Sequence, residues 1–171
     1  MPSSIYKVTH LGEGFLAIMA KPVAGEWIDE EFSSIARFGI KRLVCLLQAP
    51  EIRELGLATA ADLCASKKME YLHFPIKDRG IPHSLSKTLL LIEDLHNNIL
   101  QGANTVIHCR AGIGRTGLLS AAVLVRHGYT PVEAFHLLSK ARGVQVPDTR
   151  EQYDWVVQNQ KNLQAKLSLQ K

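Results

Sequence analysis

A ten-residue segment, HCRAGIGRTG at positions 108–117, constrains the fold more than any other part of this chain. An apolar run at 105–107 precedes it, and residues 118–125 repeat apolar side chains at helical spacing after it. A strand must therefore give way to a helix within the five residues between Cys109 and Arg115, three of which are Gly or Ala. The backbone N–H groups of so tight a loop, together with the N-terminus of the helix, form a binding site for an anion.

Two side chains give this anion site its chemistry. Arg115 adds a planar guanidinium that can bind two oxygens of a phosphate group. The loop that attracts phosphate also favours the thiolate form of Cys109, which makes that sulfur a nucleophile. A nucleophile at the base of a phosphate-binding loop indicates phosphoryl transfer through a phosphocysteine intermediate.

Two other interpretations of the segment are weaker. Residues 112–117 (GIGRTG) also fit the dinucleotide-binding pattern G-x-G-x-x-G. A dinucleotide fold requires a second strand that ends in an acidic residue about 20 positions further on, whereas residues 128–133 (GYTPVE) begin another helix. The other interpretation, a Gly-rich turn beside a buried structural cysteine, leaves Arg115 without a role.

The segment resembles the signature loop of the protein tyrosine phosphatase superfamily, whose pattern is H-C-x5-R-[S/T]. The likeness is tightest over residues 71–155. It is greatest to compact dual-specificity phosphatases, in particular the branch of the cyclin-dependent-kinase-associated phosphatase and its prokaryotic relatives. The resemblance implies that Cys109 attacks phosphorus and that the loop holds the phosphoryl oxygens, through Arg110, Ala111, Gly112, Ile113, Gly114 and Arg115. His108 precedes the nucleophile on a strand, and we expect it to support the loop by hydrogen bonds.

A second loop is expected to supply the general acid. Residues 74–82 (FPIKDRGIP) combine a strand end with a loop flanked by Gly and Pro, and they resemble the general-acid loop of dual-specificity phosphatases. Asp78 is then the proton donor for the leaving oxygen and, in the second step, the base that activates water. The alternative is a solvent-exposed Asp78 that pairs with Lys77 or Arg79.

Thr116 and Gln152 are candidates for the second step. The Thr116 hydroxyl can donate to the Cys109 sulfur as it leaves phosphorus, and it can also cap the helix start. Residues 146–153 (VPDTREQY) resemble the family's glutamine loop, x-Q-T-x-x-Q-Y, with Asp148 in place of the first glutamine. The resemblance implies that Gln152 positions the hydrolytic water, but Thr149-x-x-Gln152 is also a capping box, so both roles stay open.

Other arginines and cysteines have less specific roles. Arg79 and Arg142 are expected to be solvated surface charges, with phosphate or substrate contacts as the alternative. Cys45 and Cys64 are expected to be core thiols, and a reversible disulfide with Cys109 stays open.

Strands alternate with helices along the chain. The apolar spacing predicts strands at 15–20, 42–47, 71–74 and 104–108, and helices at 27–38, 59–68, 84–100, 116–127, 130–141 and from 149 to about 162. Unbroken apolar runs in the strands indicate a sheet covered on both faces. We therefore predict an α/β fold, a single domain over 1–171 with a mostly parallel twisted sheet of about four to five strands, helices on both faces and a polar tail from about 163.

Composition limits the partners and the compartment. The net charge is +4 without a basic, aromatic-interleaved patch, so no nucleic acid is expected. No apolar stretch reaches membrane-spanning length and the first ten residues lack a signal-peptide core, so neither membrane association nor export is expected. Three irregularly spaced cysteines favour the reducing cytoplasm. We expect a monomer with no cofactor and no metal, because the histidines outside the loop show no metal-ligand spacing, at His10, His73, His83, His96, His127 and His136.

The expected activity is hydrolysis of phosphotyrosine and phosphoserine/threonine in proteins. The pocket-deepening motif K-N-R-Y of tyrosine-specific relatives is absent, and a shallower pocket admits the shorter side chains. Vanadate and sulfate should bind the loop as phosphate does. The alternative is the same chemistry on an inositol lipid, an RNA 5′-triphosphate or a phosphoglycan, although Ile113 stands where lipid phosphatases tend to carry a basic residue. An inactive phosphoprotein-binding module is the third hypothesis, and such modules usually lack the Cys, Arg or Asp that are all present here.

Overall fold

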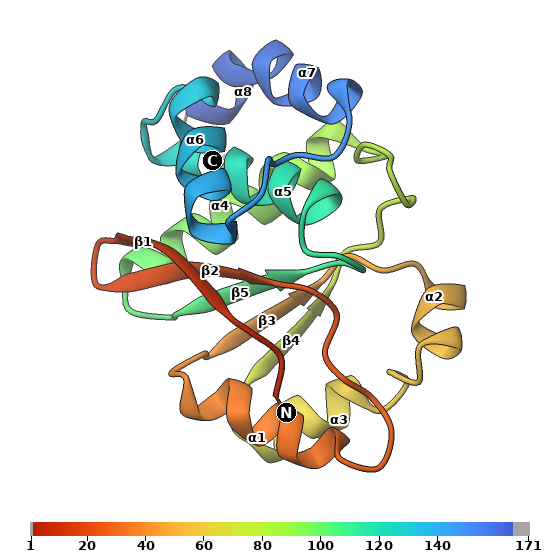
Figure 1. Cartoon of the computed structure of the whole chain (residues 1–171). Coiled ribbons are helices and arrows are strands. Elements are labelled where there is room, and N and C mark those ends of the chain that lie inside the picture. The colour runs from red at the N-terminus through yellow and green to blue at the C-terminus, as the bar shows by residue number, and fades with distance from the viewer. Residues whose placement is uncertain (1, 166–171) are drawn as a thin grey trace.

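A five-stranded sheet forms the centre of the computed structural model, which describes residues 2–165 (Figure 1). The strand order is β1-β2-β5-β3-β4. The strands are β1 (Tyr6–Leu11), β2 (Gly14–Met19), β3 (Arg42–Cys45), β4 (Glu70–His73) and β5 (Thr105–His108). All neighbours pair in parallel except β1, which runs antiparallel to β2 at the edge. The predicted α/β fold with a mostly parallel sheet is confirmed, and the carboxyl ends of the four parallel strands meet at one edge.

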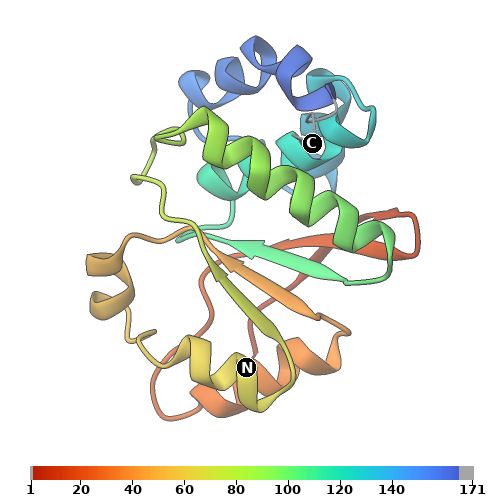
Figure 2. The ribbon, with the colours of Figure 1, turned by 180° about the vertical axis from the view of Figure 1, so that it is seen from behind.

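Helices cover both faces of the sheet (Figures 1 and 2). One face carries α4 (Leu85–Leu100), α5 (Gly114–His127), α6 (Pro131–Arg142), α7 (Arg150–Gln158) and α8 (Gln160–Gln164). The other face carries α1 (Ile28–Arg37) and α3 (Ala60–Ser66), while α2 (Ala49–Glu54) lies beyond the carboxyl ends of the strands. None of the helices within residues 2–165 combines the length and apolar character needed to cross a membrane.

The core consists of two apolar clusters, one on each face of the sheet. In β5, Ile107 packs with the cluster beneath α4 and α5, whereas Val106 packs with the cluster beneath α1 and α3. Successive side chains of a strand point to opposite faces, so a strand covered on both sides buries apolar side chains in both directions. Helix α5 is buried from Gly114 to Val125, which holds the loop at its N-terminus against a fixed core.

Each predicted strand and helix is present, and most ends agree within two residues. Two elements were not predicted from the sequence, β1 and α2. Strand β1 has a register shift between Lys7 and Thr9 that breaks the two-residue alternation, and α2 has only six residues, too few for a helical period.

The C-terminal helical region differs from the prediction. A break at Asn159 divides it into α7 and α8, and α8 continues to Gln164 with Leu163 buried. The prediction of fraying after Asn162 is therefore wrong, because Leu163 packs into the core. The remainder of the predicted polar tail, residues 166–171, lies outside the described residues.

Candidate active site

The loop between β5 and α5 holds the predicted nucleophile at the carboxyl edge of the sheet. Cys109 follows the last residue of β5 and is buried. Gly112 has φ +74°, and a Cβ there would lie 2.5 Å from the carbonyl oxygen of Met19. Only glycine combines that conformation with so close an approach to the neighbouring backbone. The loop is further tied to the end of β2 because Lys21 N–H donates to the Arg110 carbonyl at 3.1 Å.

Arg115 is the buried cation of the site, with only 1% of its side chain exposed. Its Nη1 donates to Glu51 Oε2 at 2.8 Å and to the Ile76 carbonyl at 2.9 Å. Its Nη2 donates to Glu51 Oε1 at 3.0 Å and to Asp78 Oδ1 at 3.1 Å. Burial would lower the pKa of Arg115, but the Glu51 hydrogen bonds and the nearby Cys109 and Asp78 raise it, so the guanidinium stays charged.

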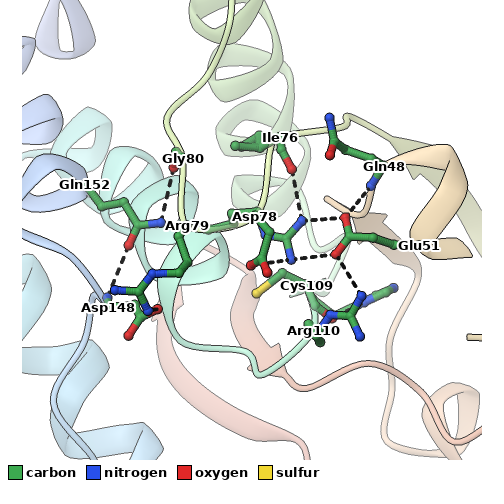
Figure 3. A network of polar contacts seen from close by, with 12 residues as sticks. Gln48, Glu51, Ile76, Asp78, Arg79, Gly80, Cys109, Arg110, Asp148 and Gln152 are labelled. Carbon is green, nitrogen blue, oxygen red and sulfur yellow. Dashed lines mark hydrogen bonds and ion pairs between the residues drawn. The ribbon is translucent and has the colours of Figure 1, made fainter.

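Glu51 is a functional candidate that the sequence analysis missed. It lies in α2, and its carboxylate also accepts from the Gln48 N–H at 2.8 Å and pairs with Arg110 at 3.4 Å (Figure 3). A single carboxylate thus contacts both arginines of the loop. The available signal was the Gln48-x-x-Glu51 spacing with Pro50 at the start of a helix, a capping pattern that begins with an uncommon residue.

Asp78 lies beside Cys109 in the same cavity (Figure 3). It belongs to a turn closed by the Gly80 N–H, which donates to the Lys77 carbonyl at 2.8 Å. The Asp78 side chain is 57% exposed, as in the alternative considered from the sequence, but its carboxylate pairs with Arg115 and not with Lys77 or Arg79. Thus the chain brings Asp78 to the loop between β5 and α5 from the carboxyl side of β4.

Gln152 connects the segment before α7 to the turn that contains Asp78. Its Oε1 accepts from the N–H groups of Asp148 and Thr149 at 3.2 and 3.1 Å, and its Nε2 donates to the Gly80 carbonyl at 3.1 Å. The capping box with Thr149 is also present. The side chain is fully buried, and its amide is occupied by these contacts.

Thr116 and His108 lie on either side of the loop sequence. The Thr116 hydroxyl is buried and has no hydrogen-bond partner among residues 2–165. His108 is also buried, and its Nδ1 donates to the Cys109 carbonyl at 3.1 Å, which fits the predicted supporting role. Burial lowers the pKa of His108 to about 4, so the ring is neutral near pH 7.

Two surface arginines make specific contacts instead of being freely solvated. Arg142 lies over the ring of Tyr6, with its guanidinium carbon 4.6 Å from the centroid, and donates to the Ala111 carbonyl at 3.0 Å. Arg79 pairs with Asp148 at 2.6 Å. Arg142 therefore supports the loop backbone from outside, a role that the sequence analysis did not foresee.

The other cysteines lie in the core, as predicted. Cys45 and Cys64 are buried and free, and both pack in the cluster of α1 and α3, whereas Cys109 packs in the cluster on the other face of the sheet. Within the described part of the chain, no group of three or more His, Cys, Asp or Glu residues is placed to hold a metal ion.

The loop after β5 and the Asp78 turn enclose one cavity of about 180 Å³. It is lined by Cys109, Arg115 and Asp78 together with Asp148 and the loop backbone. A thiol at the base of an anion-binding loop, a buried guanidinium beside it and a carboxyl group above it define a cysteine-dependent phosphatase.

The comparisons with known proteins agree with this class. Residues 17–129 match the family described as "Tc-R-P: Polymorphic toxin system, DSP-PTPase phosphatase", and the chain belongs to this family of dual-specificity phosphatases. Cyclin-dependent kinase inhibitor 3 of Rattus norvegicus is 25% identical over 143 residues, which span 82% of this chain and 67% of that protein.

Two further similarities are to a solved structure and to a curated relative. The crystal structure of kinase associated phosphatase with its catalytic cysteine replaced by serine superposes with a TM-score of 0.85 at 22% identity, over 98% of this chain and 99% of that one. An Arabidopsis thaliana phosphatidylinositol 3,4,5-trisphosphate 3-phosphatase and protein-tyrosine-phosphatase is 38% identical over 84 residues, 45% of this chain and 20% of that protein.

Proposed function

We propose that this phosphatase hydrolyses phosphotyrosine and phosphoserine/threonine in proteins through a phosphocysteine intermediate. The observation that carries the proposal is that Cys109, Arg115 and Asp78 line one cavity although they come from separate segments of the chain. The match to a dual-specificity phosphatase family and the similarity to cyclin-dependent kinase inhibitor 3 both support a phosphoprotein as the substrate.

In the first step the Cys109 sulfur attacks phosphorus and the P–O bond to the leaving alcohol or phenol breaks. The loop amides from Arg110 to Arg115 and the Arg115 guanidinium stabilise the charge on the phosphoryl oxygens. An incoming oxygen competes with Asp78 for Nη2 of Arg115, which frees the Asp78 carboxyl to face the leaving group. Asp78 acts in its protonated form in this step and donates that proton to the leaving oxygen, and the second step restores it.

In the second step water attacks phosphorus and the S–P bond breaks. Asp78 takes the proton from water, and the Thr116 hydroxyl, which has no partner within residues 2–165, donates to the departing Cys109 sulfur. The hydrogen bonds of Gln152 support a bridging role between the two loops rather than the positioning of water.

The first experiment compares hydrolysis of an aryl phosphate by the wild-type protein, Cys109→Ser and the matched control Cys64→Ala, with reductant and chelator present. We expect activity in the wild type and the control only, and retained binding of inorganic phosphate by Cys109→Ser. Equal activity in wild type and Cys109→Ser would show that Cys109 is not the nucleophile. A folded wild type that binds phosphopeptide without hydrolysing any substrate would point to a binding module.

A second candidate substrate class is a phosphoinositide. Two observations favour testing it: the similarity to the Arabidopsis thaliana enzyme and the partly exposed Arg110 guanidinium at the cavity. Initial rates on phosphopeptides, on soluble inositol phosphates and on vesicles that contain phosphoinositides separate the two classes. Faster turnover of the inositol compounds would replace the protein substrate in this proposal.

We further propose that the enzyme acts in a reducing compartment such as the cytoplasm. The three cysteines of the described residues are all free, and a thiolate nucleophile is lost on oxidation.

A further inference from the structure

The residue that follows Asp78 adopts an unusual backbone conformation. Arg79 has φ +60°, in the left-handed region that side chains with a Cβ disfavour. It lies within the turn closed by the Gly80 N–H and the Lys77 carbonyl. Such a conformation persists only where surrounding contacts hold it, and the Arg79 side chain makes an ion pair with Asp148 at 2.6 Å.

The turn that carries Asp78 is held from both sides. On the inner side, Arg115 donates to the Ile76 carbonyl at 2.9 Å. On the outer side, Arg79 pairs with Asp148 and Gln152 donates to the Gly80 carbonyl at 3.1 Å (Figure 3). Asp78 lies between these two anchors, so its position over Cys109 depends on both.

The two anchors differ in strength. Arg115 and Gln152 are buried, whereas the side chains of Arg79 and Asp148 are 64% and 42% exposed. An exposed ion pair is weakened by water and salt, so it breaks more readily than the buried contacts. The Arg79–Asp148 pair is therefore the contact that opens first, and its opening loosens a turn still held by Arg115 and Gln152.

We propose that the Arg79–Asp148 ion pair is a latch that keeps the general acid Asp78 over the nucleophile, with Arg79 and Asp148 as positioning residues. The proposal rests on the proposed function, in which Asp78 protonates the leaving oxygen. Charge supports it, because Asp148 lines the cavity of Cys109 and would repel a phosphate if Arg79 did not balance it. Asp148 also replaces the uncharged first glutamine of the loop pattern, so the ion pair depends on this departure.

The test uses leaving-group dependence, which reports on the general acid and not on folding. The variants are Asp148→Asn, Arg79→Gln and the double variant. The matched control is Asp154→Asn, which breaks the exposed Arg150–Asp154 pair on α7. The substrates are two aryl phosphates, one with a good and one with a poor leaving group, and kcat is measured separately from KM.

General acid catalysis accelerates such steps by about 10²–10⁴-fold, and partial displacement of the acid should remove about tenfold of this on the poor leaving group. We expect each single variant to lose about tenfold more kcat on the poor than on the good leaving group. The double variant should lose no more than either single variant, because the two residues act through one contact. The control should match the wild type on both substrates. Raising NaCl from about 0.05 to about 0.5 M should lower the kcat of the wild type on the poor leaving group. The kcat of Asp148→Asn should not change with salt, because its ion pair is already absent.

Equal losses on both substrates, a change in KM alone, or additive losses in the double variant would overturn the latch. These outcomes are distinct from failure of the proposed function, in which the wild type is inactive or Cys109→Ser is as active as the wild type. Misfolding would be excluded as the cause if the variants have the circular dichroism spectrum of the wild type and still lose more kcat on the poor than on the good leaving group.

Discussion

Replacing Glu51 by glutamine tests how the buried charge of Arg115 is balanced. The Glu51 carboxylate accepts from both terminal nitrogens of Arg115 at 2.8 and 3.0 Å, and its side chain is 11% exposed. Glutamine has the same shape, but it carries no charge and presents an NH2 group where the second acceptor oxygen lay. The variant therefore leaves one Arg115 N–H facing another donor.

The expected loss follows from these contacts. A hydrogen bond to a charged group contributes about 1.5–3 kcal/mol, and removing one partner of a buried ion pair costs about 3–5 kcal/mol. Arg115 retains the Ile76 carbonyl and Asp78, so we expect Glu51→Gln to lower the free energy of unfolding by about 3 kcal/mol. The control Glu30→Gln, which breaks the exposed Glu30–Arg37 pair, should cost below about 1 kcal/mol.

The effect also has a defined pH dependence. Burial by itself would raise the pKa of Glu51, but the hydrogen bonds from Arg115 and the Gln48 N–H and the charges of Arg115 and Arg110 lower it below its ordinary value of 4.5. A carboxyl group whose pKa is lower in the folded than in the unfolded chain stabilises the fold fully above pH 4.5, and this stabilisation is lost as the pH falls through the folded pKa. The difference between wild type and Glu51→Gln should therefore be largest near neutral pH and shrink below pH 4.5.

Urea unfolding, followed by the fluorescence of the buried Trp155, measures this difference. Inorganic phosphate should stabilise Glu51→Gln more than the wild type, because the bound anion replaces the missing charge. The reasoning would be refuted if Glu51→Gln cost no more than Glu30→Gln, or if its cost did not change below pH 4.5.

Three other predictions follow from the site and the core. Asp78→Asn should lower kcat for phenyl or alkyl phosphates by at least about 10²-fold, and much less for an aryl phosphate with a good leaving group; equal losses in steady-state rates would remove Asp78 from the role of acid. Thr116→Val should keep the thermal unfolding midpoint of the wild type, because the hydroxyl that it removes has no partner among the described residues. Stopped-flow should show a burst of product as phosphocysteine accumulates, and a linear time course would contradict the donation from Thr116 to the departing sulfur. Burial lowers the pKa of both His108 and His96 from 6.5 to about 4, with the charges of His127 and Arg126 adding to the effect on His96. The unfolded chain therefore takes up protons first, and the free energy of unfolding should fall between pH 6.5 and 4 by up to about 1.4 kcal/mol per pH unit for each histidine. His96→Gln should reduce the slope of the free energy of unfolding against pH, measured by urea unfolding at each pH. An unchanged slope would contradict this prediction.

The loop around Cys109 could be predicted from the sequence because its properties are local. Gly and Ala between a strand and a helix restrict the backbone to one tight turn, and that turn brings together Cys109 and Arg115, which lie within seven positions of each other. The strands and long helices could also be predicted from the sequence, because the spacing of their apolar residues shows which side faces the core. Asp78 required the family resemblance, since one aspartate in a loop carries no periodic signal.

The contacts that surround the loop were decided only by the tertiary structure. Glu51 reaches Arg115 across 64 positions of sequence, and Arg79 reaches Asp148 across 69. The carboxyl ends of parallel strands meet at one edge of the sheet, which brings α2 and the Asp78 turn around the same loop. The segment before α7 reaches that loop from α6, which packs against α5. The sequence by itself predicted the residues of the proposed chemistry at Cys109 and Arg115, whereas the balance of the buried charge and the position of the proposed acid depend on ion pairs between distant segments, which leave no local pattern.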